Sequence, residues 1–379
     1  MTSVFIKVLD KPLFKKYFKY CREEQSREDK LCAYAEFVSE IYAGGISFTD
    51  LVCKYLFEDE NIYIRSVAHK IEVSDSVKTA VKHEISVFER FSSLSTSDFA
   101  KDLGVEYVSP FESYKTDVWA RFNDRLVAVN KLGYGIFSSS VMFRLSDDCE
   151  IEPIASADKT TMDKFVGYEE ERLRVVNNTK AFIEGRPAAN VLLCGDAGTG
   201  KSSTVKAIAN NYFAEGIRLI ELRKDQLRYL PYVMGKISEN PLKFIIFIDD
   251  LSFNRSDDNF SMLKATLEGS ASAKAKNAVI YATSNRRHII KESFDDRGGT
   301  DVHINDTLQE SLSLSERFGL VVLFQKPSKQ LYLDIVHTLV YRNGINMDPR
   351  ELDIKAEAFA LRKGSRSARC AEQFVESLM

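Results

Sequence analysis

Residues 195–202 read Gly195-Asp196-Ala197-Gly198-Thr199-Gly200-Lys201-Ser202 and match the pattern G-x-x-x-x-G-K-[ST]. A loop of this kind wraps the phosphates of a nucleoside triphosphate, because its glycines let successive backbone N–H groups approach and surround an anion. In that arrangement Lys201 reaches the β- and γ-phosphates and the Ser202 hydroxyl binds Mg²⁺. We include the next residue, Ser203, in the predicted phosphate site.

The flanks of this loop have the pattern that a phosphate loop requires. Residues 190–194 form an apolar run typical of a buried strand, and residues 203–209 have helical spacing. The start of that helix would place its positive dipole end beneath the phosphates. Strand and helix patterns then alternate as far as residue 326, so we expect an α/β domain with a parallel sheet. Its strands are expected near residues 190–194, 217–222, 244–249, 278–283 and 320–325.

Two further apolar runs end in polar side chains. Residues 244–248 lead into Asp249 and Asp250, and the run that begins at Ala278 ends at Asn285. Ligands bind at the carboxyl ends of strands in open α/β sheets. Asp249 is therefore expected to hold Mg²⁺ opposite Ser202, and Asp250 to orient and polarise the attacking water. Asn285 would position the same water if its strand lies between the other two.

The composition of the 379 residues is that of a soluble globular chain without a strong charge bias. Hydrophobic residues make up 44%, charged residues 28%, and the net charge is −3, so nothing global favours nucleic acid or an anionic membrane. The six cysteines are scattered without a C-x-x-C pair, which argues against disulfides and zinc. The amino terminus has no signal-peptide layout, and no apolar run approaches 18 residues. We expect a cytoplasmic protein without membrane association.

Three domains are predicted. Residues 1–150 form a mainly helical N-terminal domain with a short β element near residues 133–152, residues 151–326 form the α/β nucleotide-binding domain, and residues 327–379 form a helical lid. In the first domain, Lys15, Lys16 and Lys19 lie opposite an apolar stripe at helical spacing. This helix could contact nucleic acid or a membrane surface, although a packed stripe with solvated lysines is the commoner meaning of such a pattern.

The order of these motifs, completed by Ser315-Glu316-Arg317-Phe318, resembles that of AAA+ ATPases. Residues from about 150 to 379 are similar, more narrowly, to an uncharacterised bacterial AAA+ family known as a domain of unknown function. The stretches that carry this resemblance are residues 152–154, 165–169, 249–253, 281–288, 313–319 and 366–369.

The resemblance implies ATP as the nucleotide and a homo-oligomer as the active form. The segment that covers the adenine corresponds to Phe165, Val166, Gly167 and Tyr168. Arg317 takes the position of the arginine finger, which is donated to the nucleotide of the neighbouring subunit. Arg369, or failing that Arg366, matches the lid arginine that contacts the γ-phosphate. Arginine suits both tasks because its planar fork meets two phosphate oxygens and neutralises developing charge.

Two departures from the AAA+ pattern bear on function. Asp250 stands where most AAA+ proteins carry Glu, and one methylene less changes its reach to the water enough to slow hydrolysis. No substrate-threading loop is evident, since Tyr232-Val233-Met234-Gly235 lies in a stretch with helical spacing.

Three functions are consistent with these features. The first is an oligomeric Mg²⁺-dependent ATPase that remodels or loads a protein partner engaged by residues 1–150. The second is a nucleotide-dependent switch or scaffold with slow hydrolysis, which Asp250 favours. The third is a loader that acts on nucleic acid, for which the lysine-bearing helix is the only support, because no reader motif accompanies it.

Overall fold

The computed structural model describes residues 2–23, 25–251, 263–267, 275–285 and 317–379. Its contacts divide the chain into two compact units, Met1–Ser139 and Ser140–Met379. Among the described helices, none is both long and apolar enough to cross a membrane.

The first unit is helical and is built around aromatic side chains. The rings of Phe5, Phe37, Phe48 and Phe122 are fully buried, and Phe37 meets Phe48 edge to face with 5.5 Å between ring centroids. Buried aromatic rings in such arrangements contribute stability beyond their area alone. The helices are η1 (Ile6–Asp10), α1 (Pro12–Tyr20), α2 (Arg27–Gly44), α3 (Phe48–Phe57), α4 (Ile62–Ala68), α5 (Asp75–Ser92), α6 (Thr96–Leu103), α7 (Val118–Val127), α8 (Val129–Leu132) and η2 (Gly135–Ser138).

Helix α1 is the lysine-bearing helix of the sequence. Its apolar stripe packs into the core of the unit, as the buried Leu13 and Phe14 show. Two of its lysines form ion pairs with α2, Lys16 with Glu40 and Lys19 with Glu36, both at 2.7 Å. The apolar face of the helix thus packs in the core, while two lysines of its polar face pair with α2. Much of its positive charge is balanced within the unit.

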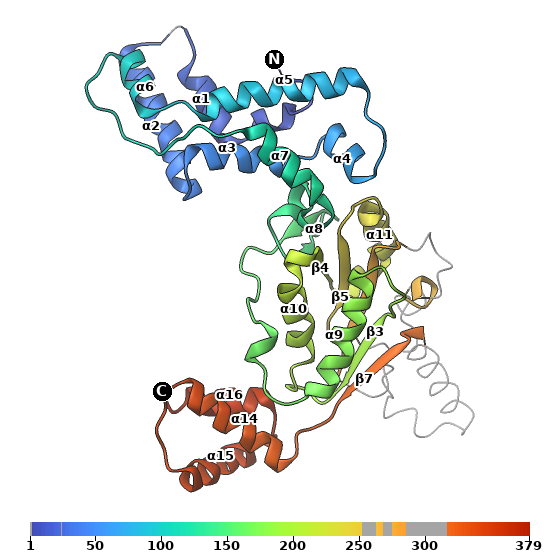
Figure 1. Ribbon diagram of the computed structural model, residues 1–379. Coiled ribbons are helices and arrows are strands. Elements are labelled where there is room, and N and C mark those ends of the chain that lie inside the picture. The colour runs from blue at the N-terminus through green and yellow to red at the C-terminus, as the bar shows by residue number, and fades with distance from the viewer. Residues whose placement is uncertain (1, 24, 252–262, 268–274, 286–316) are drawn as a thin grey trace. The chain divides into compact units, whose positions relative to one another are not determined.

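The second unit contains a seven-stranded sheet in the order β2-β1-β4-β5-β6-β3-β7 (Figure 1). All neighbouring strands are parallel except β1 and β2. The expected fold class, a parallel α/β sheet of the P-loop type with a helical lid, is confirmed. The strands are β1 (Met142–Leu145), β2 (Ile151–Pro153), β3 (Val191–Gly195), β4 (Ile217–Leu222), β5 (Lys243–Ile248), β6 (Ala278–Ser284) and β7 (Leu320–Phe324).

The short β element near residues 133–152 requires a correction. Strand β1 pairs with β4, with Phe143 opposite Ile220, so this element extends the sheet of the second unit and the contacts divide the chain at residue 139 instead of 150. The strand also begins only at Met142, because Gly135–Ser138 forms a 3-10 turn. The local pattern shows a strand but does not show its partner, which lies more than 70 residues further along the chain.

Two helices pack against the central strands and hold the phosphate loop. Helices α9 (Glu169–Ile183) and α10 (Lys201–Asn211) lie beside each other (Figure 1). Val175 of α9 and Ile208 of α10 are buried in one apolar cluster with side chains of β3, β5 and β6. The remaining helices of this region are η3 (Met162–Lys164), η4 (Phe213–Glu215), η5 (Lys224–Tyr229) and α11 (Leu230–Ser238).

Residues 232–235 lie within α11, as their spacing predicts. Val233 is fully buried and Met234 nearly so, while Tyr232 is more exposed. The segment therefore serves packing, and its aromatic residue is part of a helix instead of a loop.

The C-terminal region of the second unit forms a small bundle of α14 (Lys329–Arg342), α15 (Pro349–Lys363) and α16 (Ala368–Glu376). Ser328 caps α14, accepting a hydrogen bond from the Leu331 N–H at 3.1 Å, as expected for a serine at this position. Tyr332, Ala356 and Ala371 form the buried centre of this bundle. The side chain of Val166, from the segment before α9, packs against the same centre.

Candidate nucleotide site

The phosphate loop connects β3 to α10 and depends on its glycines. Gly195, Gly198 and Gly200 all have positive φ, at 135°, 76° and 86°. A Cβ atom on Gly195 would lie 1.9 Å from the backbone oxygen of Phe324 in β7, so this position admits no side chain. The next N–H, that of Asp196, donates to the same oxygen at 3.2 Å. Strand β7 thereby fixes where the loop begins.

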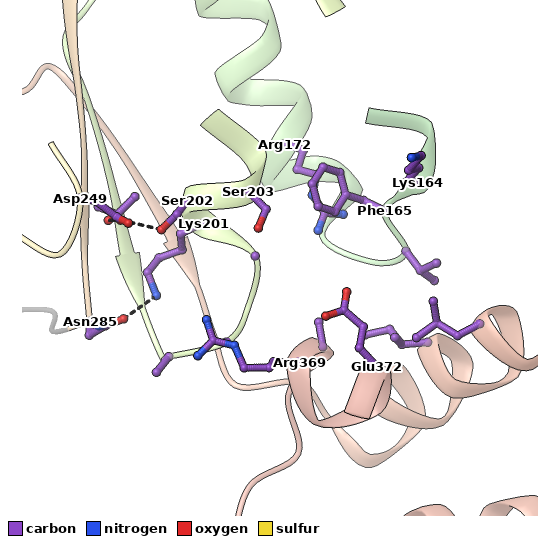
Figure 2. A pocket seen from close by; sticks show the side chains of 18 residues that line it. Lys164, Phe165, Arg172, Lys201, Ser202, Ser203, Asp249, Asn285, Arg369 and Glu372 are labelled. Carbon is purple, nitrogen blue, oxygen red and sulfur yellow. Dashed lines mark hydrogen bonds between the residues drawn. The ribbon is translucent and has the colours of Figure 1, made fainter. Parts of the chain in front are cut away.

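The metal-binding side chains predicted from the sequence lie in contact. The Ser202 hydroxyl donates to Asp249 Oδ1 at 2.6 Å (Figure 2). The Thr283 hydroxyl donates to the same oxygen at 2.5 Å. A hydroxyl and a carboxylate side by side fit Mg²⁺, which takes few protein ligands and completes its octahedron with water and phosphate oxygens. Ser202 and Asp249 are thus the residues that would hold the ion.

Lys201 lies at the centre of the site. Its Nζ donates to the backbone oxygens of Gly195 at 3.0 Å and Asp196 at 2.7 Å, and to Asn285 Oδ1 at 3.1 Å (Figure 2). Burial lowers the pKa of Lys201, while Asp196 and other nearby acidic groups oppose this effect. Two of these acceptors belong to the phosphate loop and the third to Asn285 at the end of β6. The ammonium group is therefore held beside the loop, where phosphate oxygens would be bound.

Asp250 and Asn285 form a pair next to Lys201. Strand β6 does lie between β5 and β3, which is the condition under which Asn285 comes level with the loop. Asn285 Nδ2 donates to Asp250 Oδ1 at 2.8 Å. The backbone of Asp250 has φ 51°, unusual for a residue other than glycine, and its N–H donates to the Thr283 hydroxyl at 3.0 Å. Strained backbone of this kind is found at functional sites, where the surroundings maintain it.

A cavity of about 250 Å³ extends from the phosphate loop toward the lid. Of the predicted adenine segment, Phe165 and Val166 line this cavity. Gly167 and Tyr168 are not among the described residues that line the cavity. They position the segment instead. A Cβ on Gly167 would come within 2.6 Å of Leu331, and the Tyr168 hydroxyl donates to the Gln325 backbone oxygen at 2.6 Å.

The geometry distinguishes between the two candidate lid arginines. Arg369 lines the cavity, its backbone N–H donates to the Gly198 oxygen at 3.3 Å, and its side chain extends from α16 toward Lys201 and Asn285 (Figure 2). Arg366 instead forms a bidentate pair with Glu357 inside the lid, at 2.9 and 2.7 Å. Arg369 is therefore the better placed to reach a γ-phosphate.

Arg317 lies three residues before β7 and is not among the described residues that line the cavity. Its action on the nucleotide of a neighbouring subunit remains a prediction. The basic pair Arg286 and Arg287, next to Asn285, lies outside the described residues, as do residues 313–316.

Thr283, Glu372 and Arg172 are among the cavity-lining residues that were not predicted from the sequence. The Thr283 hydroxyl forms hydrogen bonds with Asp249 and with the Asp250 N–H. Its position in the sequence, two residues before Asn285 at the end of a strand, could have indicated that it belongs to the site. Glu372 lines the cavity one helical turn after Arg369. Arg172 lines it one turn after Tyr168, and burial lowers the pKa of its guanidinium to about 10. Helical spacing from Arg369 could have pointed to Glu372.

The chain has relatives among known proteins. The model of a family described as "Protein of unknown function (DUF815)" matches residues 138–379. The replication factor C small subunit of Archaeoglobus fulgidus is 31% identical over 119 residues, which are 28% of this chain and 35% of that protein, so only about a third of this relative is matched. A solved structure of the Thermotoga maritima RuvB Holliday junction branch migration motor aligns over 58% of this chain and 72% of its own, with 13% identity and a TM-score of 0.34.

The family match covers the whole region that carries the sheet, the phosphate loop and the lid. In that region the loop follows β3, the paired acids follow β5, and Asn285 follows the strand between them, which is the arrangement of an AAA+ P-loop fold. The chain therefore belongs to the family described as "Protein of unknown function (DUF815)".

Proposed function

We propose that this protein is an ATPase that requires Mg²⁺ and acts as a homo-oligomer in the cytoplasm. ATP binding and hydrolysis would drive the remodelling or loading of a protein partner, engaged by the helical first unit. The observation that carries the proposal is the joining of Ser202 to Asp249 and of Lys201 to Asn285 at one edge of the sheet. The proposal is supported because these contacts bring together the side chains that would bind Mg²⁺ and the cation that would bind phosphate, as phosphoryl transfer requires.

The roles of the remaining residues follow from this placement. Asp250 would orient the attacking water together with its hydrogen-bond partner Asn285, while Arg369 would contact the γ-phosphate from the lid. Arg317 would stabilise developing charge on the nucleotide of the neighbouring subunit. Phe165 and Val166 would cover the adenine, since both line the cavity, and Phe165 lies on the side away from Lys201 (Figure 2).

A nucleotide-dependent switch with slow hydrolysis is the second candidate. Asp250 is one methylene shorter than the usual Glu, and its carboxylate is held by Asn285 at 2.8 Å. A short and tethered carboxylate lies further from an attacking water, and small displacements of this kind reduce rates strongly. A loader acting on nucleic acid has less support, because Lys16 and Lys19 of α1 are paired with acidic residues of α2.

Release of phosphate from ATP, measured against protein concentration, tests the oligomeric ATPase. If Arg317 acts in trans, the rate per subunit should rise with concentration and saturate. Arg317→Ala should lower turnover by about 10³-fold while ATP binding persists, because the arginine acts in the transition state. Arg350→Ala, an exposed arginine of α15, is the control and should change neither property. A rate per subunit independent of concentration, together with an unaffected Arg317→Ala variant, would exclude this assembly.

A further inference from the structure

Arg172 is a buried cation in the wall of the nucleotide cavity. Only 6% of the residue is exposed, and its guanidinium lies 4.3 Å from the centre of the Phe165 ring (Figure 2). Its Nη1 donates to the backbone oxygen of Gly167, and its Nε donates to the Thr204 hydroxyl at 3.3 Å. The side chain is therefore fixed between the adenine segment and helix α10.

No carboxylate lies within ion-pair distance of Arg172 among the residues that the structure describes. The carboxylate of Glu169, on the same turn of α9, accepts from the Gly167 N–H at 2.8 Å. Even with a pKa lowered to about 10 by burial, the guanidinium is charged at neutral pH. A buried charge is unfavourable unless it is paired, so the missing anion is expected from a ligand.

The position of the guanidinium selects which part of a nucleotide would supply this anion. A Cβ atom built on Gly200 would lie 3.5 Å from Arg172 Nη2, so this nitrogen faces the end of the phosphate loop where α10 begins. The opposite end of the site holds Lys201 against Asn285, where the γ-phosphate is expected. Phe165 covers the other side of the guanidinium, toward the base. The phosphate between these limits is the one attached to the nucleoside.

We propose that Arg172 binds the α-phosphate of the nucleotide. The inference rests on the proposed function, since it assumes that the cavity receives ATP. It assigns the charge of Arg172 to ligand binding, and its hydrogen bonds to Gly167 and Thr204 to holding the guanidinium in place. An α-phosphate is common to AMP, ADP and ATP and is absent from adenosine. The role of Arg172 can thus be separated from that of residues that contact the β- and γ-phosphates.

The test compares Arg172→Met and Arg172→Lys with the unaltered full chain. Affinities for adenosine, AMP, ADP and ATP are measured by competition against a fluorescent ADP analogue. Arg172→Met should weaken AMP, ADP and ATP by a similar factor, about tenfold or more, because each loses one charge-assisted contact. Adenosine binding should stay within about twofold, and Arg172→Lys should recover part of the loss. Arg174→Met, an exposed arginine on the same helix, should leave all four affinities unchanged.

Thermal unfolding without ligand gives a second readout. Arg172→Met removes an unpaired buried cation and should unfold at the same temperature as the unaltered chain or higher, whereas a purely structural arginine would lower that temperature. The proposal is overturned if Arg172→Met weakens the binding of adenosine as much as that of AMP. It is also overturned if the Arg172→Met variant binds all three nucleotides with the affinity of the unaltered chain. An unaltered chain that binds ATP no better than adenosine would instead refute the proposed function, and this inference with it.

Discussion

Gly195→Ala should destabilise the second unit far more than an ordinary glycine substitution. The new Cβ would lie 1.9 Å from the Phe324 oxygen, and real contacts of this kind begin near 3.0 Å, so the end of β7 must retreat. That retreat breaks the 3.2 Å hydrogen bond from the Asp196 N–H, worth about 1 kcal/mol. Overpacking adds about 1–3 kcal/mol, and alanine at φ 135° adds about 1–2 kcal/mol. Together these contributions amount to about 3–6 kcal/mol.

Urea unfolding measures this loss if each unit is followed by its own signal. Trp119 is the only tryptophan and belongs to the first unit, so its fluorescence reports that unit, while far-ultraviolet circular dichroism follows the sheet as well. Gly195→Ala should shift the dichroism transition to lower urea and leave the fluorescence transition in place. Gly185→Ala is the matched control: its φ is 74° and nothing lies within 4 Å of its Cβ, so it should cost about 1 kcal/mol. Equal losses for the two variants would refute the contact argument.

Three further changes test other parts of the structure. Burial alone would raise the pKa of Glu84, but hydrogen bonds from the backbone N–H groups of residues 3–5 lower it. The ionised carboxylate therefore stabilises the first unit above pH 4.5, and this stabilisation is lost as the pH falls through the lowered pKa. Glu84→Gln should lower the free energy of unfolding, followed by Trp119 fluorescence, by about 2–3 kcal/mol at pH 7 and by little at pH 2. Thr283→Val removes the hydroxyl that positions Asp249 and the Asp250 N–H, and should lower ATP turnover about 10–100-fold with little effect on ATP binding without metal. Asp249→Asn can keep the hydrogen bond from Ser202 but loses the charge, so calorimetry should show ATP affinity that no longer responds to Mg²⁺.

The parts of the fold that follow from local sequence could be predicted. Buried parallel strands are continuous apolar runs, so residues 244–248 marked β5 within one residue of its start, and the glycines of residues 195–200 marked the turn that follows β3. The approach of Asn285 to Lys201 could be predicted conditionally, because it required only that β6 lie between two strands already identified.

The remaining features depend on contacts between distant segments. The pairing of β1 with β4 is invisible in the sequence of either strand, which is why the β element was assigned to the first domain. Arg172 has the spacing of an ordinary surface residue on a polar helix, and its burial arises only when Phe165 and Thr204 pack around it. The difference between Arg366 and Arg369 depends on Glu357, which binds Arg366 from nine residues away in the lid.

The most direct test of the central claim compares the unaltered chain with Asp250→Asn in two assays, binding of Mg²⁺–ATP by calorimetry and release of phosphate. If Ser202, Asp249 and Lys201 bind Mg²⁺–ATP and Asp250 orients the water, the variant should bind with an affinity within about twofold and release phosphate about 10²-fold or more slowly. Arg350→Ala again serves as the control and should match the unaltered chain in both assays. Failure of the unaltered chain to bind Mg²⁺–ATP, or equal phosphate release by Asp250→Asn, would contradict the claim.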